Sequence, residues 1–232
     1  MNKRIIPRKL FKSQDREDKE LLKWFHHLCG GTFIEMGALD GELFSNSYAF
    51  SFGLDWKGIL IEASPRHFES LIQNRPNELA TVHAAACDKP RKVHFVDAGA
   101  DKPAVSGIYE FASESFRNAW WTEELLATKT AIECLPLTQI LHLHVGDRFF
   151  FDFFSLDVEG AEFQVLNTLD FQKYQFGIIL VESDSGDVNA TKNHAIQSLL
   201  EVNGYKYLQE YARSLWFMNT DFDKIYKHVA NI

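Results

Sequence analysis

The sequence predicts an α/β fold: a mostly parallel seven-stranded sheet with helices on both faces and an antiparallel hairpin at its C-terminal end. Apolar runs of strand length alternate with segments of helical periodicity through most of the chain, as in repeated βαβ units. The run Phe149–Leu156 is almost wholly apolar, as expected for a strand covered on both faces. Two β-rich runs near the end, Tyr205–Tyr211 and Ser214–Asn219, have little between them and favour the hairpin.

Local signals place the elements in order, beginning with a helix after Ser13. Ser13 can cap this helix, and Asp15, Glu17 and Asp18 place anions at its positive end. The strands expected next are Thr32–Glu35, Gly58–Glu62, Ala80–Ala86, Phe149–Leu156, Phe176–Val181 and the two hairpin strands, with Lys92–Val96 and Ala131–Leu135 as shorter additions. The helices expected between them are Glu42–Phe52, Pro65–Asn74, Leu137–Leu143, Ala161–Leu169 and His194–Asn203.

Length and composition fit one domain, because the chain has 232 residues with 46% hydrophobic content. We expect residues 1–30 to form an N-terminal arm and helix, and residues 31–232 to form a single domain. The segment 98–130 is an insert that the predicted sheet does not explain, and it is a candidate lid or substrate region. The oligomeric state does not follow from the sequence.

Charge and hydropathy exclude two classes of partner. The formal net charge is −8, although the first twelve residues hold five cations and no acid. Such an acidic body repels phosphate backbones, so no nucleic-acid partner is expected, and the basic arm is interpreted as a solvated tail or linker. No stretch approaches the roughly 18 to 20 apolar residues of a membrane span. No signal segment is visible before Pro7, so a cytoplasmic location is expected.

The three cysteines, Cys29, Cys87 and Cys134, are widely spaced. They form neither a CxxC pair nor a recognisable disulfide or zinc pattern. We therefore expect buried thiols in a reducing compartment.

Two carboxylates frame a glycine turn in the first βαβ unit. Glu35 ends the first expected strand, Gly37 and Gly41 follow it, and Glu62 ends the second strand. The glycines let the chain turn closely, and an acid at the position of Glu62 commonly binds a ribose diol. The spacing indicates an adenosine-bearing ligand.

The other expected strand ends are acidic as well. In parallel sheets ligands bind beyond the carboxyl ends of the strands. The acids at or just past these ends are Glu35, Glu62, Asp88, Asp157 with Glu159, and Glu182 with Asp184. Together at one edge of a sheet they indicate a site that handles a cation, either a sulfonium cofactor or a divalent metal.

Between Thr32 and Asp184 the chain resembles the FkbM family of S-adenosylmethionine-dependent methyltransferases. The matching segments are Phe33–Gly41, Ser45–Ser47, Gly58–Ala63, Ala84–Cys87 and Ser155–Glu162, of which Asp157-Val158-Glu159-Gly160-Ala161-Glu162 is the most specific. The resemblance implies a Rossmann-like class I methyltransferase fold. It also implies transfer of a methyl group to a hydroxyl, often on a sugar or a polyketide.

The resemblance further implies roles for single residues. Glu35, Gly37 and Gly41 would surround the methionine part of S-adenosylmethionine, Glu62 would hold the ribose hydroxyls, and Ala86 and Cys87 would line the adenine pocket. The remaining expected cofactor contacts are Ala38, Asp40, Ser45, Asn46, Ala63 and Asp157. The chain departs from the family pattern at two points, since many members have Asp in place of Glu35 and Asn in place of Leu39 or Asp40.

Asp157, Glu159 and Glu182 are the expected catalytic residues. A hydroxyl is a poor nucleophile while protonated, so a general base must remove its proton or a metal must lower its pKa. Asp157 lies at the right strand end for either role. By analogy of fold, Asp157, Glu182 and Asp184 could also bind Mg²⁺ or Mn²⁺, which prefer carboxylates. Glu162, at the start of a helix, is expected to stabilise that helix.

The main prediction is an O-methyltransferase acting on a sugar or glycan, or another small-molecule acceptor. The alternatives are a methyltransferase for a lipid or polyketide hydroxyl, a non-catalytic interaction module, and an NAD-dependent oxidoreductase, which is disfavoured because Gly-x-Gly-x-x-Gly is absent. Trp120 and Trp121 in the insert, with Tyr109, Phe111 and Phe116 nearby, are either core residues or part of a lid or a stacking platform for a pyranose ring. The alternative bases are His83, His94, His142 and His144.

Overall fold

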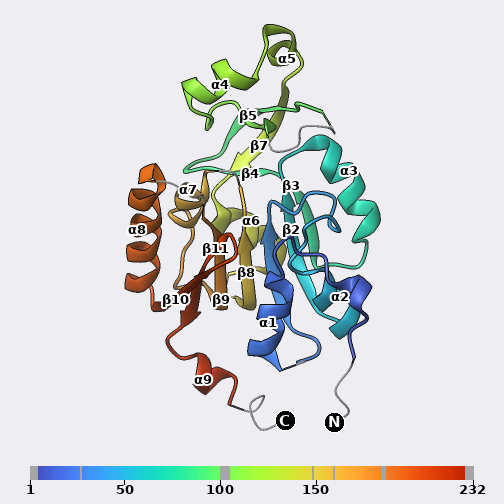
Figure 1. The fold of residues 1–232 in the computed structure, drawn as a ribbon, viewed down its shortest axis with the longest axis vertical. Coiled ribbons are helices and arrows are strands. Elements are labelled where there is room, and N and C mark those ends of the chain that lie inside the picture. The colour runs from blue at the N-terminus through green and yellow to red at the C-terminus, as the bar shows by residue number, and fades with distance from the viewer. Residues whose placement is uncertain are drawn as a thin grey trace.

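The computed structural model describes residues 5–26, 28–99, 105–147, 149–158, 160–183 and 187–227. Its main sheet has seven strands in the order β10-β11-β9-β8-β1-β2-β3 (Figure 1). The strands are β1 (Thr32–Met36), β2 (Lys57–Glu62), β3 (Ala80–His83), β8 (Phe149–Leu156), β9 (Tyr174–Glu182), β10 (Tyr205–Tyr211) and β11 (Ser214–Asn219). β1, β2, β3, β8 and β9 are parallel, and β11 runs antiparallel to both of its neighbours. The predicted sheet is confirmed.

Helices cover both faces of this sheet because its strands are apolar on both sides. On one face, Phe33 and Phe153 pack beneath α1 (Glu17–Phe25), α2 (Tyr48–Leu54), α3 (Pro65–Asn74) and α9 (Phe222–Ile225). On the other face, Ile34 and Phe154 pack against α6 (Leu137–Val145), α7 (Glu162–Leu166) and α8 (Asp187–Val202). Successive side chains along each strand thus point to opposite faces and pack into two separate hydrophobic cores. The ring centroids of Phe33 and Phe153, on the neighbouring strands β1 and β8, are 5.4 Å apart and the rings are stacked.

A second sheet lies beyond the carboxyl ends of the parallel strands, with α4 (Glu114–Trp120) and α5 (Glu123–Ala127) at its outer side (Figure 1). Its four strands are β4 (Ala85–Ala86), β5 (Arg91–Val96), β6 (Gly107–Ile108) and β7 (Thr130–Leu135), in the order β4-β7-β5-β6. The single strand predicted at Ala80–Ala86 is therefore wrong. The chain leaves β2 after His83 and pairs Ala85 and Ala86 with β7 instead.

The helix predicted at Glu42–Phe52 begins only at Tyr48. The preceding residues form a loop, because the backbone N–H of Asn46 and the hydroxyls of Ser45 and Ser47 donate to the Glu35 carboxylate. Side chains that bind outside the helix in this way compete with helix formation. The loop brings Ser45 and Asn46 to the end of β1.

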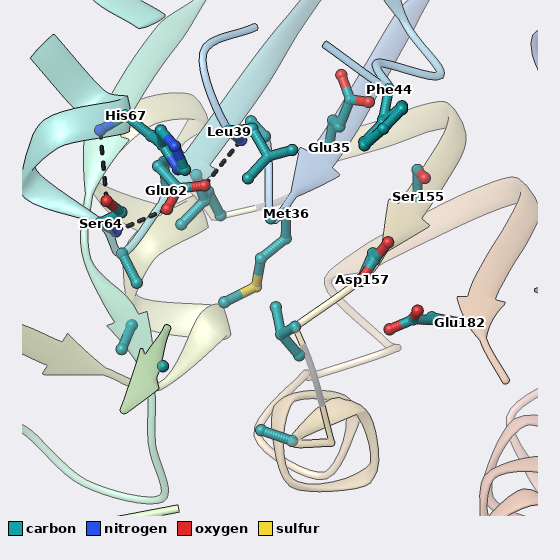
Figure 2. Close-up of a pocket in the computed structure, with 18 of the residues that line it drawn as sticks. Glu35, Met36, Leu39, Phe44, Glu62, Ser64, His67, Ser155, Asp157 and Glu182 are labelled. Carbon is teal, nitrogen blue, oxygen red and sulfur yellow. Dashed lines mark hydrogen bonds between the residues drawn. The ribbon is translucent and has the colours of Figure 1, made fainter. Parts of the chain in front are cut away.

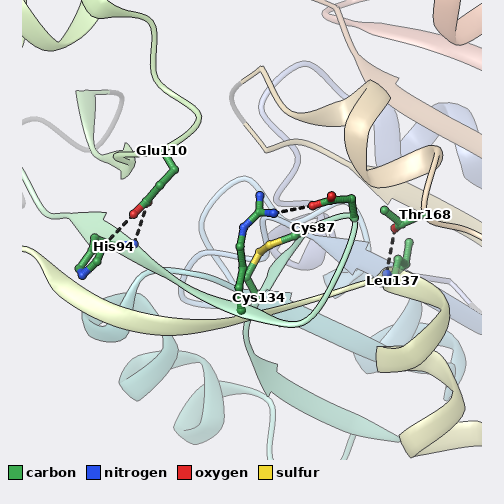
Figure 3. The surroundings of a disulfide bond; sticks show 8 residues. Cys87, His94, Glu110, Cys134, Leu137 and Thr168 are labelled. Carbon is green, nitrogen blue, oxygen red and sulfur yellow. Dashed lines mark hydrogen bonds and ion pairs between the residues drawn. A yellow bond between two sulfur atoms is a disulfide. The ribbon is translucent and has the colours of Figure 1, made fainter.

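The prediction of three buried thiols is wrong. Cys87 and Cys134 form a disulfide, with their Cα atoms 5.6 Å apart (Figure 3), while Cys29 is exposed. The two half-cystines are brought together by β4 and β7, which pair in parallel, and the N–H of Cys87 donates to the carbonyl oxygen of Leu135. The bond thus fixes the start of the second sheet to the segment that leaves the main sheet.

The N-terminal arm is fixed to the body from Lys12 onward, so the predicted solvated tail is wrong there. The N–H groups of Lys12 and Ser13 donate to the Asp18 carboxylate, and the Ser13 hydroxyl accepts from the N–H of Asp18. Ser13 also forms a parallel β-bridge with Phe44, and Lys12 forms an ion pair with Glu42. Within the described ranges, no helix is long and apolar enough to cross a membrane.

Candidate active site

A cavity of about 280 Å³ lies at the carboxyl ends of β1, β2 and β8 (Figure 2). Ten of the residues singled out from the sequence line it: Glu35, Gly37, Ala38, Ser45, Asn46, Glu62, Ala63, Ala86, Asp157 and Glu182. Figure 2 shows Glu62 at one end and Asp157 with Glu182 at the other, with the Met36 side chain between them. Carboxylates thus lie on both sides of Met36, and the cavity volume of about 280 Å³ is just below the usual range for small-molecule sites.

Glu62 holds the loop after β1 against the end of β2. Its two carboxylate oxygens accept the N–H of Leu39 at 2.8 Å and the N–H of Ser64 at 2.6 Å. Leu39 adopts a left-handed conformation with φ of 47°, which is part of the turn that presents its N–H. Burial raises the pKa of Glu62 to about 7, against these donors. Each oxygen keeps a further lone pair for a ligand hydroxyl.

Gly37 allows the loop after β1 to lie against the end of β8. Its φ is +85°, and a Cβ atom there would lie 1.7 Å from the backbone oxygen of Asp157. The N–H groups of Gly37 and Ala38 both donate to the carbonyl of Ile61. A glycine is therefore required for both the turn and the close approach.

Glu35 lines the cavity but is engaged within the protein. One oxygen accepts the N–H of Asn46 at 2.6 Å, and the other accepts the hydroxyls of Ser45 and Ser47. Burial raises the pKa of Glu35, and the guanidinium of the fully buried Arg75 opposes this rise. Glu35 shapes the loop 45–47, and the role predicted for it beside the methionine part stays a prediction.

Asp157, Glu182 and Arg213 form a charged group at the far end. Arg213, between β10 and β11, donates to Glu182 at 2.6 Å. Burial, a hydrogen bond with Asp157 and the charges of Asp157 and Glu162 raise the pKa of Glu182 to about 9. Asp157 is exposed to the cavity whereas Glu182 is buried. Asp157 is therefore the member of the pair that a ligand in the cavity can reach.

This group does not fit a divalent metal ion. No cluster of three His, Cys, Asp or Glu side chains is placed to bind one among the residues that the structure describes, and Asp184 lies outside them. The guanidinium of Arg213 already pairs with one carboxylate oxygen of Glu182.

Three predicted cofactor contacts lie away from the cavity, and one catalytic candidate is outside the described ranges. Asp40 accepts the N–H groups of Glu42 and Leu43, and a Cβ on Gly41 would lie 2.6 Å from the Arg75 side chain. Cys87 is in the disulfide. Glu159 lies outside the described residues.

Glu162 binds within the protein, as expected for a residue at a helix start. It accepts the N–H groups of Val158 and Gly160 and forms an ion pair with Lys192.

The four alternative histidines do not line the cavity. His83 stacks on Phe68, and His94 and His142 pair with Glu110 and Asp147. Trp120 and Trp121 are also absent from its lining, which leaves the platform role without support.

Several lining residues were missed by the sequence analysis. They are Gln14, Phe44, His67, Phe95 and Arg213, whereas Ile108 and Phe111 lie in the insert 98–130 that is expected to be a candidate lid or substrate region. His67 could have been found, since it lies in the first turn of α3, just after Glu62. Phe95, Ile108 and Phe111 belong to the second sheet and its following turn, whose position no local pattern reveals.

The comparison with known protein families gives one match. The sequence model of the methyltransferase FkbM domain matches residues 35–207. Among curated proteins, none matches the chain.

Several solved structures are similar to the chain at low sequence identity. An FkbM methyltransferase from Methylobacillus flagellatus KT is 14% identical, with 82% of this chain and 43% of that longer chain covered and a TM-score of 0.46. The fibrillarin of Aeropyrum pernix, with natively bound S-adenosylmethionine, is 10% identical, with 90% and 75% covered and a TM-score of 0.45. Cofactor-bound Rv0187 from MTB is 13% identical, with 93% and 84% covered and a TM-score of 0.48.

Proposed function

The chain belongs to the FkbM methyltransferase family, and from this premise we propose that it transfers the methyl group of S-adenosylmethionine to a hydroxyl oxygen of a sugar or glycan. Dependence on S-adenosylmethionine follows from the family. The hydroxyl and the sugar are the proposed part, and the Asp157 carboxylate, exposed in the cavity beside the buried Glu182, is the observation that carries it.

The residues of the cavity fit S-adenosylmethionine. Glu62 has lone pairs left for the two ribose hydroxyls, and charged acceptors make the stronger hydrogen bonds. The side-chain oxygen of Asn46 is buried, has no hydrogen-bond partner among the described residues and suits the ammonium of the methionine part. Ala86 and the apolar residues Phe95 and Ile108 suit the adenine ring.

The chemistry at the other end is that of a general base. When bound, S-adenosylmethionine supplies an electrophilic methyl group on a sulfonium, so the protein must orient the acceptor and remove its proton. Asp157 is the exposed carboxylate of the pair and accepts the hydroxyl proton as the oxygen becomes nucleophilic. Burial and a hydrogen bond with Asp157 raise the pKa of Glu182, and Arg213 holds the Glu182 carboxyl group in place.

Transfer of a labelled methyl group tests this proposal. The protein is incubated with S-adenosylmethionine labelled with ¹³C in the methyl group and a panel of mono- and oligosaccharides, lipid hydroxyls and polyketide hydroxyls. Mass spectrometry should find the label as a methyl ether on a sugar. Label only on a lipid or polyketide would select that alternative acceptor, and label on nitrogen or carbon would overturn the assignment of O-methylation. Binding of NAD in place of S-adenosylhomocysteine would indicate the oxidoreductase.

A further inference from the structure

A second, smaller cavity of about 40 Å³ adjoins the acceptor end of the first. Both cavities are lined by Phe44, Asn46, Asp157, Glu182 and Arg213, together with Gln14 and Ser155. The smaller one adds the acids Asp15 and Glu17 from the N-terminal arm and the start of α1. A molecule that reaches Asp157 from this side therefore meets the arm as well as the sheet.

Phe44 lies where the two cavities meet, in a conformation that bulky residues rarely adopt. Its φ is +58°, in the left-handed region that disfavours a Cβ. The parallel bridge with Ser13 holds it on one side, and the bonds from Ser45 and Asn46 to Glu35 hold the next residues. Strained positions persist only where the surroundings impose them, and they concentrate at ligand sites.

The Phe44 side chain is largely open to solvent and is not packed in a hydrophobic core. It is 46% exposed, and the ring pairs found between described residues do not include it. Figure 2 shows it on the same side of the cavity as Ser155, Asp157 and Glu182, across Met36 from Glu62. The constrained backbone of Phe44 thus keeps its apolar ring exposed on the side of the cavity where the proposed base, Asp157, lies.

The polar groups around this ring select a neutral ligand rich in hydroxyls. Asp15, Glu17 and Asp157 accept hydrogen bonds and oppose an anion, whereas Arg213 and the Gln14 amide can donate. Burial raises the pKa of Glu17, and one of its carboxylate oxygens accepts the N–H of Asp15. A sugar matches both the polar side chains and the exposed ring of Phe44. Its hydroxyls can form hydrogen bonds with the polar side chains while its C–H face lies on the aromatic ring.

We propose that Phe44 is the stacking platform for the acceptor's pyranose ring, and that the small cavity between Phe44, the arm residues 14–17 and Arg213 receives the hydroxyls of that ring. This inference rests on the proposed function and deepens it. It assigns acceptor recognition to the loop after β1 and to the N-terminal arm, in place of the aromatic pair of the insert.

The test compares Phe44→Ala with Phe44→Trp and with Phe52→Ala. Phe52 is a matched control, because it is 50% exposed but lines neither cavity. Phe44→Ala should raise KM for the sugar acceptor at least about tenfold and leave the affinity for S-adenosylhomocysteine within about twofold, since only acceptor binding is lost. Phe44→Trp should keep KM near the wild-type value, and Phe52→Ala should change neither constant.

A fourth variant, Phe44→Gly, separates recognition from structure. Glycine adopts the positive φ without strain, so this variant should unfold at nearly the wild-type temperature while losing acceptor affinity as Phe44→Ala does. A purely structural role would instead lower the unfolding temperature and weaken S-adenosylhomocysteine binding together.

Saturation-transfer NMR of neutral monosaccharides on protein saturated with S-adenosylhomocysteine gives a readout independent of catalysis. Sugar signals that appear with the wild type and vanish with Phe44→Ala support the platform even if no methyl group is transferred, in which case the proposed function fails alone. Methyl transfer to a sugar with an unchanged KM in Phe44→Ala overturns the platform alone. Absence of any sugar signal with the wild type also overturns it.

Discussion

A Cβ atom on Gly37 would lie 1.7 Å from the backbone oxygen of Asp157. The N–H of Asp157 in turn donates to the carbonyl of Met36 at 3.0 Å. The turn after β1 and the end of β8 are therefore in direct backbone contact. Both segments line the cavity, the first as the expected cofactor-binding turn and the second with the expected base, Asp157.

Gly37→Ala should destabilise the fold and abolish binding of S-adenosylhomocysteine. The new methyl group overlaps backbone that cannot rotate away, which should cost at least about 3 kcal/mol. Gly99→Ala is the matched control, because Gly99 has φ of +94° with no atom within 4 Å of the added Cβ and should lose only about 1–2 kcal/mol through its backbone conformation. Chemical denaturation measures both, and equal losses would contradict the close contact.

Binding of S-adenosylhomocysteine should strengthen as the pH rises through 7. Glu62 has a pKa raised to about 7 by burial, and its ionised form accepts the ribose hydroxyls better. His67 lines the same cavity as Glu62, but burial lowers the pKa of His67 below its ordinary value of 6.5, so His67 does not account for a change centred on pH 7. Isothermal titration between pH 5.5 and 8.5 should show the trend in the wild type and a weak, pH-independent affinity in Glu62→Gln, lower by about five- to hundredfold.

Glu62 should affect the stability of the ligand-free protein in the opposite direction, so that stability falls as the pH rises. In the absence of ligand, the folded protein binds the Glu62 proton more tightly than the unfolded chain, whose pKa is the ordinary 4.5. The contribution of Glu62 to stability is thus complete below pH 4.5 and is lost as the pH rises through 7. The difference in unfolding free energy between the wild type and Glu62→Gln should follow this course, and a difference that is constant with pH would contradict it.

Asp157→Asn should reduce kcat by about 10² to 10⁴-fold, because it removes the proposed base. Glu182→Gln should retain most of the activity, since Glu182 with its pKa raised to about 9 is already protonated at neutral pH and glutamine also donates a hydrogen bond. Steady-state rates at pH 7 measure both variants. A loss in Glu182→Gln as large as that in Asp157→Asn would mean that Glu182 acts in its ionised form.

Reduction of the disulfide should destabilise the protein by about 2–4 kcal/mol. The Cys87–Cys134 bond closes a loop of 47 residues in sequence separation that includes most of the second sheet. Cys134→Ala should unfold at a lower temperature than the wild type, whereas Cys29→Ala should be neutral because Cys29 is exposed. Alkylation without reductant should label Cys29 alone, and labelling of all three cysteines would show that the bond is absent.

Much of the main sheet could be predicted because its signals are local. Phe149–Leu156 and the two hairpin strands have the predicted bounds, since continuous or β-rich runs between turns leave few alternatives. Glu62 and Asp157, at the two ends of the site, could also be predicted from local signals. Glu62 and Asp157 end apolar strands, and parallel strands bring their carboxyl ends to one edge.

The rest depends on contacts that sequence patterns do not encode. No residue marks the point after Ala84 where the chain changes sheets, so β3 and β4 were predicted as one strand. Pairing of Cys87 with Cys134 requires β7 to return beside β4. Phe44 and Arg213 lie in a loop and a hairpin turn, and only long-range packing brings them together.

The most direct test of the central claim is a crystal structure with S-adenosylhomocysteine bound. We expect both ribose hydroxyls within hydrogen-bond distance of the Glu62 carboxylate, and the sulfur atom at the end of the cavity that Asp157 and Phe44 line. Glu62 without contact to the ribose, or a sulfur atom turned away from Asp157, would contradict the assignment of the cofactor site and of the base.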